Sequence, residues 1–446
     1  MSARATPDQA IRPMPEPAFD FDAPIDRRAA VDCRKWNRYP ADTLPMWVAD
    51  MDFGVPAPIR EALRARLDHP VLGYAGPPPA LVEAILAMLE ARHGWRVAPE
   101  AIVMLPGVEP GFNMALRALL RPGDGVAIQS PAYAPIRAAP GHWGLGRVEV
   151  PVADGVAAME GTLSRPGTRA LLLCNPHNPT GTVLDAPALS RIAAACLRHD
   201  VLVVSDEIHC DLVLDGRRHV PIAALDPEVA RRSVTLMSAS KTYNVAGLKA
   251  AFAIVPDPGL RQRFVAARAG MVDSVNLMGL VATEAALRGC EEWRRALLSC
   301  LAANRDFLAA ELARRFPSIG FAPPQASFLA WLDCRALGLG ADPQAFFLER
   351  ARVAFSPGAE FGPLGEGHVR LNFGCRRATL AEALDRMEAA LAAHDSAQPR
   401  FEITRLDGTP LKEGTPVATL LIPGEEAQLK LHPDHERQQR AMSASA

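Results

Sequence analysis

The feature that most constrains the fold is a series of short strand-like runs between residues 101 and 255, several of which are continuously apolar. Strands that are apolar on both faces are typical of a mainly parallel sheet with helices on both sides. Helical patterns accompany these runs, so the sequence predicts an α/β architecture. The predicted strands are 101–105, 125–129, 147–150, 170–174, 201–205, 233–237 and 251–255.

Flanking segments extend this pattern in both directions. Apolar periodicity predicts helices over 59–67, 80–93, 109–120 and much of 259–316. A second group of elements predicts a smaller α+β domain: strands 328–332 and 368–373, and helices 342–351 and 379–393. After residue 397 the composition shifts, and strand-like runs at 401–405, 417–422 and 427–431 predict a β-rich appendage with a disordered end from about residue 435.

A chain of 446 residues exceeds the size of a single hydrophobic core, so several domains are expected. Polar, proline-rich residues at the start predict a flexible arm. The predicted division is 1–30 for this arm, 31–70 for a segment that packs with the small domain, 71–280 for a large domain, 281–396 for a small C-terminal domain and 397–446 for the appendage.

The charge balance favours small-molecule chemistry. With 22% charged residues and a formal net charge of -2, the chain has no field that would attract nucleic acid or an anionic membrane. It contains neither a signal-peptide core nor about 18 consecutive apolar residues, so a cytoplasmic protein is expected. Its eight cysteines are scattered without a Cys-x-x-Cys pair, so no metal site is predicted and the thiols are expected to be reduced.

A lysine at the end of one predicted strand is the leading candidate for catalysis. Lys241 lies in the stretch 238–249, Ser-Ala-Ser-Lys-Thr-Tyr-Asn-Val-Ala-Gly-Leu-Lys. Desolvation would lower the pKa of the amine and make it a nucleophile, although a strand-end lysine that reaches solvent fits the same position. The hydroxyls of Ser238 and Ser240 and the cation of Lys249 add the features of a phosphate site. An amine beside a phosphate site is what pyridoxal phosphate requires.

Polar groups also follow other predicted strands, at the edge where open α/β sheets bind ligands. Gly107 and Val108 enter a helix whose free N–H groups suit a phosphate. Asp206 suits a pyridinium nitrogen, and equally a helix cap. Asn178 lies between two prolines that fix the backbone, which suits an amide held against a ring oxygen. Tyr133 suits stacking on a flat cofactor as well as an ordinary core position.

An arginine lies inside an apolar strand of the smaller domain. Arg370, within 368–373, needs an anion there. A substrate carboxylate and a structural Asp or Glu are equally suitable partners.

Taken in order, these elements resemble the fold-type I pyridoxal-phosphate enzymes of the aspartate aminotransferase superfamily, over about residues 30–395. The resemblance implies the fold-type I transferase fold, an amino-acid substrate and one role for each matching residue. Lys241 would form the internal aldimine; Gly107, Val108, Ser238, Ser240 and Lys249 would hold the phosphate; Tyr133 would stack on the ring, Asn178 would contact O3′, Asp206 would pair with the ring nitrogen and Arg370 would hold the substrate carboxylate.

Two stretches narrow the resemblance to the MalY/PatB branch, the cystathionine β-lyase-like carbon–sulfur lyases. They are 45–53, Pro-Met-Trp-Val-Ala-Asp-Met-Asp-Phe, and 205–212, Ser-Asp-Glu-Ile-His-Cys-Asp-Leu. In the second, His209 stands near O3′, where many aminotransferases carry a tyrosine. In the first, Trp47 and Asp50 are expected at the substrate site.

The branch implies a β-elimination of L-cystathionine or a related cysteine S-conjugate to a thiol, pyruvate and ammonia. Transamination between an L-amino acid and a 2-oxo acid uses the same residue types, so it remains the main alternative. A cofactor-binding scaffold without activity, whose tail recruits a protein partner, is the second alternative.

One further position bears on assembly. By resemblance, Tyr74 reaches the phosphate of a neighbouring subunit. This implies a homodimer with shared active sites.

Overall fold

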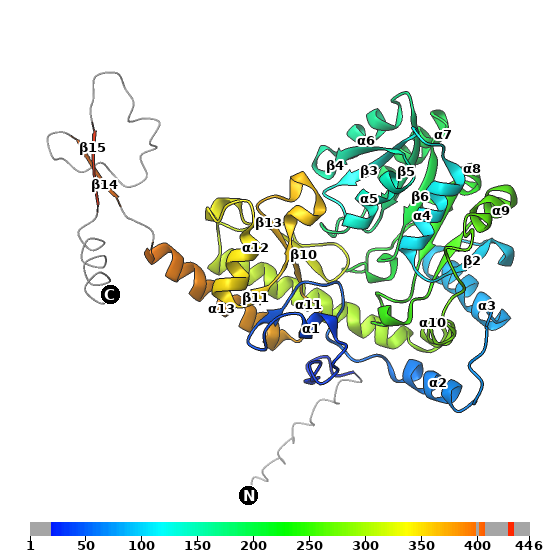
Figure 1. Cartoon of the computed structure of the whole chain (residues 1–446), viewed down its shortest axis with the longest axis horizontal. Helices are drawn as coiled ribbons and strands as arrows, with labels where there is room; N and C mark the ends of the chain where they lie inside the picture. The colour runs from blue at the N-terminus through cyan, green and yellow to red at the C-terminus, as the bar shows by residue number, and fades with distance from the viewer. Residues whose placement is uncertain (1–18, 398–400, 406–426, 432–446) are drawn as a thin grey trace, which may run out of the picture. The chain divides into compact units, whose positions relative to one another are not determined.

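The computed structural model describes residues 19–397, 401–405 and 427–431 (Figure 1). It contains two compact units, of which the first ends at Arg386 and the second begins at Met387. In the described ranges, no helix is both long enough and apolar enough to span a membrane. The predicted domain boundaries at 70/71 and 280/281 lie inside the first unit and stay predictions.

A seven-stranded sheet in the order β2-β8-β7-β6-β5-β3-β4 forms the centre of the first unit (Figure 1). Its neighbours β7, β6, β5, β3 and β4 pair in parallel, whereas β8 is antiparallel to both β7 and β2. The mainly parallel sheet is thus confirmed. Because β2 and β7 are both antiparallel to β8, they run in the same direction and end at the same edge of the sheet. The strands are β2 (Ile102–Leu105), β3 (Gly125–Ser130), β4 (Gly146–Pro151), β5 (Thr168–Cys174), β6 (Leu202–Asp206), β7 (Ser233–Met237) and β8 (Ala251–Ile254).

Hydrophobic cores on both faces explain why the strands are continuously apolar. In β5, Leu172 belongs to one core, together with Phe112 of helix α4 (Val108–Leu119). Its neighbours Leu171 and Leu173 belong to a separate core with residues of α6 (Gly155–Leu163) and α7 (Ala186–Arg198). Each successive side chain of a parallel central strand therefore meets a helix, which leaves no polar face.

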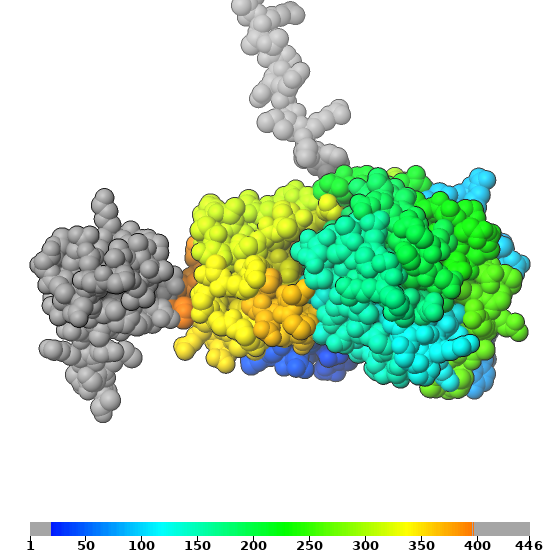
Figure 2. All heavy atoms as spheres, turned by 90° about the horizontal axis from the view of Figure 1, so that it is seen from above, coloured from blue at the N-terminus to red at the C-terminus, as the bar shows by residue number. Residues whose placement is uncertain are grey.

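A second, antiparallel sheet in the order β12-β13-β10-β9 carries the C-terminal strands of the first unit. Its bounds are β9 (Gly320–Phe321), β10 (Leu329–Asp333), β12 (Ser356–Pro357) and β13 (His368–Asn372). The N-terminal strand β1 (Leu44–Pro45) pairs in parallel with β11 (Val353–Ala354). Figure 2 shows this yellow and orange part directly against the cyan and green part that contains the large sheet. Backbone bonds join the two, among them Leu214 N to Gln325 O at 2.9 Å.

The helices mostly follow the predicted pattern, with one kind of difference. Two predicted helices end in π-helical turns: α3 (Pro79–Met88) continues as η1 (Leu89–His93), and α12 (Pro343–Phe346) as η8 (Phe347–Ala351). Apolar periodicity does not distinguish such a turn from a regular one. The remaining long helices are α2 (Ala57–Leu67), α5 (Ala134–His142), α9 (Pro258–Ala266), α10 (Leu277–Gly289), α11 (Glu291–Arg315) and α13 (Arg377–Ala397).

The second unit contains the predicted strands at 401–405 and 427–431. They form an antiparallel pair, β14 (Phe401–Arg405) with β15 (Ala427–Leu431). The predicted strand 417–422, the predicted disordered end from 435 and the first 18 residues of the predicted arm lie outside the described residues.

Candidate active site

A cavity of about 700 Å³ lies where the parallel strands end. It brings together eleven of the predicted site residues from segments far apart in the sequence. These are Gly107, Val108, Tyr133, Asn178, Asp206, His209, Ser238, Ser240, Lys241, Lys249 and Arg370. The shared edge of the sheet is the physical reason that they meet.

Lys241 follows β7 and lines this cavity. Its Nζ donates a hydrogen bond to the Ala49 carbonyl oxygen at 2.7 Å. Burial and the charge of Arg370 lower the pKa of Lys241 to about 8, against opposing contributions from Asp50 and Asp206. An appreciable share of neutral, nucleophilic amine is therefore present near neutral pH.

Asp206 is the last residue of β6 and is buried. Its Oδ1 accepts a hydrogen bond from the Ile208 backbone N–H at 3.1 Å, as a capping acid would. Burial raises the pKa of Asp206 to about 7. None of the described basic side chains forms an ion pair with Asp206, so a cationic partner inside the cavity would be stabilised there.

Hydroxyl groups, backbone N–H groups and an ammonium group line the cavity together. Helix α4 begins at Val108 without a side-chain cap, which leaves backbone N–H groups of its first turn free. Ser238 Oγ lies 2.8 Å from Ser240 Oγ and 2.7 Å from the Ala250 carbonyl oxygen. Lys249 is exposed and adopts a left-handed conformation with φ of 52°. Such a combination suits a phosphate group.

Arg370 also lines the cavity and is 95% buried, with 5% exposure. Its guanidinium donates to Asn178 Oδ1 at 3.0 Å and to the Trp47 carbonyl oxygen and Ser356 Oγ, each at 3.1 Å. It also lies over the Phe361 ring, 4.9 Å from the centroid. Its Nε has no partner, and in the described part of the chain no carboxylate pairs with it. The structural Asp or Glu that the sequence left open is therefore not found among these residues.

His209 and Tyr133 complete the polar lining. Burial lowers the pKa of His209 to about 3, so its imidazole is neutral, and no described residue pairs with its Nδ1. Burial and the charge of Glu109, which also lines the cavity, raise the pKa of Tyr133. Tyr133 keeps 38% exposure, which is more than an ordinary core tyrosine.

The stretch 45–53 contributes backbone where side chains were expected. The Trp47 indole donates to the Lys35 carbonyl oxygen at 3.1 Å and does not line the cavity. The Asp50 carboxylate pairs with Arg27 at 2.8 Å and does not line it either. The cavity receives Val48 and Ala49 from this stretch.

Tyr74 lies apart from the other predicted residues. It is fully exposed, in a segment without regular secondary structure, and does not line the cavity of its own chain.

Some cavity residues were missed by the sequence reasoning. Asn113 is one turn along α4 from Glu109, and Cys174 ends β5. The position of Cys174 at a strand end was a usable signal, although its apolar environment concealed it. Ser356 and Phe361, which contact Arg370, gave no signal, because their proximity depends on the pairing of β12 with β13.

The chemistry of these donors fits pyridoxal phosphate. The cavity offers an amine with a lowered pKa, a buried carboxyl group for a ring N–H, an amide beside an arginine and a partly exposed aromatic ring. The hydroxyls, Lys249 and the start of α4 supply the phosphate end.

Comparisons with known proteins agree with this chemistry. Residues 42–387 match the family described as aminotransferase class I and II. The chain is 40% identical over 382 residues to cystathionine beta-lyase PatB of Bacillus subtilis, which covers 82% of this chain and 98% of PatB. It is 33% identical over 395 residues to protein MalY of Escherichia coli, covering 84% and 99% of the two chains.

A solved structure gives the same result. Cystalysin from Treponema denticola, whose crystal structure contains pyridoxal 5'-phosphate, is 29% identical with a TM-score of 0.80, over 84% of this chain and 99% of that one. The family match covers most of the chain, and PatB is matched along nearly its whole length. This chain is therefore a pyridoxal-phosphate-dependent member of the aminotransferase class I and II family and belongs to its PatB and MalY branch.

Proposed function

We propose that this chain is a carbon–sulfur β-lyase that converts L-cystathionine, or a related cysteine S-conjugate, to a thiol, pyruvate and ammonia. One observation supports an amino-acid substrate. The buried Arg370 shares a cavity with Lys241, and its Nε has no partner among the described residues. The names of relatives support the reaction, since PatB and the 31%-identical protein of Corynebacterium glutamicum are both called cystathionine beta-lyase.

The residues would divide the work as follows. Arg370 would hold the α-carboxylate through its planar fork, and Asn178, whose Oδ1 accepts from Arg370, would offer its amide N–H to the ring oxygen. Asp206 would hold the ring N–H, and His209 would add a neutral imidazole to the ring site. The phosphate would be bound by the hydroxyls of Ser238 and Ser240, by Lys249 and by the Gly107–Val108 turn. When bound, the cofactor supplies an electron-withdrawing ring that makes the α-proton acidic.

Lys241 is the proposed base. Its Nζ takes the α-proton. The electron pair of the broken C–H bond becomes the second bond between the α- and β-carbons, while the pair of the β-carbon–sulfur bond leaves with sulfur. Lys241 then gives its proton to the departing thiolate, which leaves as a thiol. One water molecule hydrolyses the released enamine to pyruvate and ammonia.

Product analysis separates the lyase from the transaminase. Purified holoenzyme is incubated with L-cystathionine, with and without a 2-oxo acid. Pyruvate and ammonia that form without an acceptor support the lyase. Strict dependence on the 2-oxo acid would instead establish transamination, because that reaction needs an amino-group acceptor.

A homodimer with shared active sites is also proposed. Tyr74 is fully exposed and lies beside Val71 and Leu72, which are 60% and 58% exposed. Exposed apolar side chains next to a tyrosine that does not reach its own cavity are typical of a subunit interface. Sedimentation should give a dimer, and Tyr74→Phe should weaken cofactor binding several-fold. A fully active monomer would contradict the proposal.

We also propose a cytoplasmic location, because the cysteines form no disulfide bonds. All eight cysteines are unpaired in the structure. Unpaired, mostly buried cysteines are typical of a reducing compartment.

A further inference from the structure

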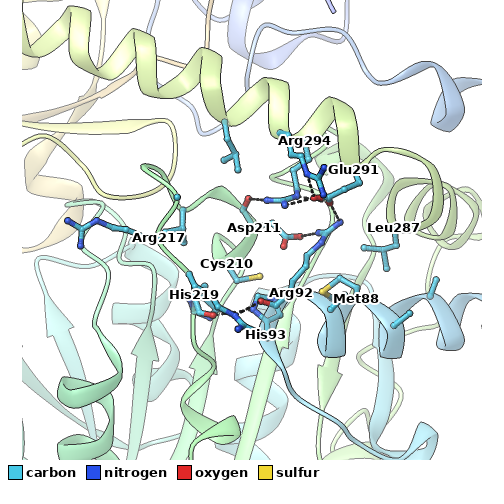
Figure 3. A pocket seen from close by; sticks show the side chains of 18 of the residues that line it. Met88, Arg92, His93, Cys210, Asp211, Arg217, His219, Leu287, Glu291 and Arg294 are labelled. Carbon is cyan, nitrogen blue, oxygen red and sulfur yellow. Dashed lines mark hydrogen bonds and ion pairs between the residues drawn. The ribbon is translucent and has the colours of Figure 1, made fainter. Parts of the chain in front are cut away.

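A second cavity, of about 1170 Å³, lies on the other side of the segment that follows β6 (Figure 3). His209 lines the active-site cavity, whereas the next residues, Cys210 and Asp211, line this one. Residues of α3, η1, α10 and α11, together with the loop 213–219, form the rest of its wall. Consecutive residues of this segment thus line two separate cavities.

Three buried side chains meet at the floor of this second cavity. His93, Cys210 and Asp211 each offer one potential ligand atom, and these atoms all lie within 4.8 Å of one another. His93 is the last residue of the π-helix η1, and Cys210 and Asp211 begin the short helix η4 (Cys210–Leu212). In Figure 3 their side chains converge from these two elements. Single π-helical turns occur often at functional sites.

Their hydrogen bonding leaves ligand atoms free. His93 Nδ1 lies 3.4 Å from the His219 carbonyl oxygen, while its Nε2 is buried without a partner among the described residues, and the residue is only 8% exposed. The Cys210 thiol donates no hydrogen bond within the described residues. A buried imidazole nitrogen without a partner is costly, and a carbonyl on the opposite nitrogen is the usual arrangement around a metal-binding histidine.

Asp211 keeps one oxygen available as well. Its Oδ2 accepts a hydrogen bond from Arg92 at 2.6 Å, while Oδ1 accepts none from the described part of the chain. Arg92 is in turn paired with Glu291 at 2.8 Å. Glu291 also pairs with Arg294 at 2.7 Å and with Arg295 at 3.1 Å. A bound cation would therefore share the Asp211 carboxylate with Arg92.

His219 lies beside the cluster but outside the set of ligand atoms within 4.8 Å of one another, so its ring would have to move inwards to become a fourth ligand. Its ring lies 5.4 Å from that of His93, centroid to centroid, and its Nδ1 is buried without a partner. Its Nε2 lies 2.7 Å from Glu207 Oε2. A carboxylate behind the imidazole is the arrangement that orients and strengthens a histidine ligand.

We propose that His93, Cys210 and Asp211 form a binding site for a divalent transition metal of the zinc class, with His219 or a water molecule in the fourth position. One sulfur, one nitrogen and one carboxylate oxygen suit zinc better than calcium or magnesium, which prefer oxygen alone. Tetrahedral zinc places its ligands roughly 3.5 Å apart, so the cluster needs to close by about 1 Å. The sequence predicted no metal site, because spacing rules do not link His93 to a cysteine more than 100 residues away.

Metal binding to the tag-free holoenzyme tests this site directly. After dialysis against a chelator, the protein is titrated with Zn²⁺, and bound zinc is counted by mass spectrometry. We expect one zinc per chain, and zinc-edge X-ray absorption with one sulfur neighbour at about 2.3 Å. Cys210→Ser should remove the sulfur signal and weaken binding at least tenfold. Cys196→Ser, which changes an equally buried thiol in α7, is the matched control and should change neither.

His93→Gln gives a second, independent variant in case Cys210→Ser does not fold, and it should also weaken binding at least tenfold. The cofactor content of each variant reports whether its active site is intact. Binding below one zinc per two chains, or a sulfur signal that survives in Cys210→Ser, would overturn the proposal. So would unchanged affinity in His93→Gln.

Discussion

At the scale of single residues, the lowered pKa of Lys241 has a measurable consequence. Only the neutral amine attacks the cofactor aldehyde, and the pKa of Lys241 is about 8. The rate at which cofactor-free protein takes up pyridoxal phosphate should therefore rise about tenfold per pH unit below 8 and level off above it. Stopped-flow absorbance between pH 7 and 9.5 measures this rate.

The same experiment has an internal control. The positive charge of Arg370 helps to lower the pKa of Lys241. Arg370→Gln should therefore shift the midpoint of the profile to higher pH. A midpoint near 10.5, the ordinary lysine value, in the unmodified protein would show that the amine is not desolvated.

Arg370 itself yields a second prediction. Arg370→Lys keeps the charge but loses the planar fork, so we expect KM for the amino acid to rise at least tenfold and kcat to change less. Cofactor content should stay at one per chain. Arg377→Lys, at an arginine outside the cavity, should leave KM unchanged. An unchanged KM in Arg370→Lys would remove Arg370 from the substrate site.

The position of a residue at the cavity could be predicted from the sequence where a strand determines that position. Lys241, Asp206 and Asn178 follow parallel strands, and the common edge of the sheet brings them together. The side chains of Trp47 and Asp50, which lie in a segment without a long element, do not line the cavity. There, the direction of a side chain depends on contacts with Lys35 and Arg27 that no local pattern encodes.

At the scale of elements, the tight contact between α10 and the Lys249 loop should control cofactor binding. A Cβ on Gly279 would lie 2.6 Å from the Leu248 carbonyl oxygen and 2.8 Å from Ala250 Cβ. Gly279→Ala should displace this loop, cost about 1–3 kcal/mol of stability and weaken cofactor affinity. Fluorescence titration with the cofactor measures the affinity.

Gly161→Ala in α6 is the matched control, since a Cβ there meets nothing within 4 Å. It should leave cofactor affinity unchanged and stabilise the helix slightly, because alanine favours helix more than glycine. Equal cofactor affinity in both variants would show that the Lys249 loop tolerates the displacement.

Helix α11 is anchored by one buried amide. Asn304 Nδ2 donates to the Phe373 and Cys375 carbonyl oxygens at 3.0 and 2.8 Å, and its Oδ1 accepts from Arg377. Asn304→Ala would leave these buried groups without partners, so we expect a loss of about 2–3 kcal/mol in the free energy of unfolding. Urea denaturation measures it. Ser299→Ala on the exposed face of α11 should change it by less than about 0.5 kcal/mol.

At the scale of the whole molecule, the C-terminal part is expected to be dispensable for catalysis. The family match ends at residue 387, and 98% of PatB is matched by 82% of this chain. A chain that ends after Ala397 should keep its lyase activity within about twofold and the same thermal midpoint. Loss of activity in the shortened but dimeric protein would show that the β14–β15 unit contributes to the site.

The placement of the stretch 45–53 has a consequence for how the enzyme is made. Asn244 donates hydrogen bonds to the Met51 and Phe53 carbonyl oxygens, and Asn372 donates to Val48 and Asp50. Val48 leaves the ribosome 324 residues before Asn372 does. Contacts of such separation form late, because the intervening chain must close first. A ribosome-bound chain therefore contains Lys241 well before the stretch 45–53 can be fixed against this lysine. We expect the protein to bind the cofactor only at the last stage of synthesis.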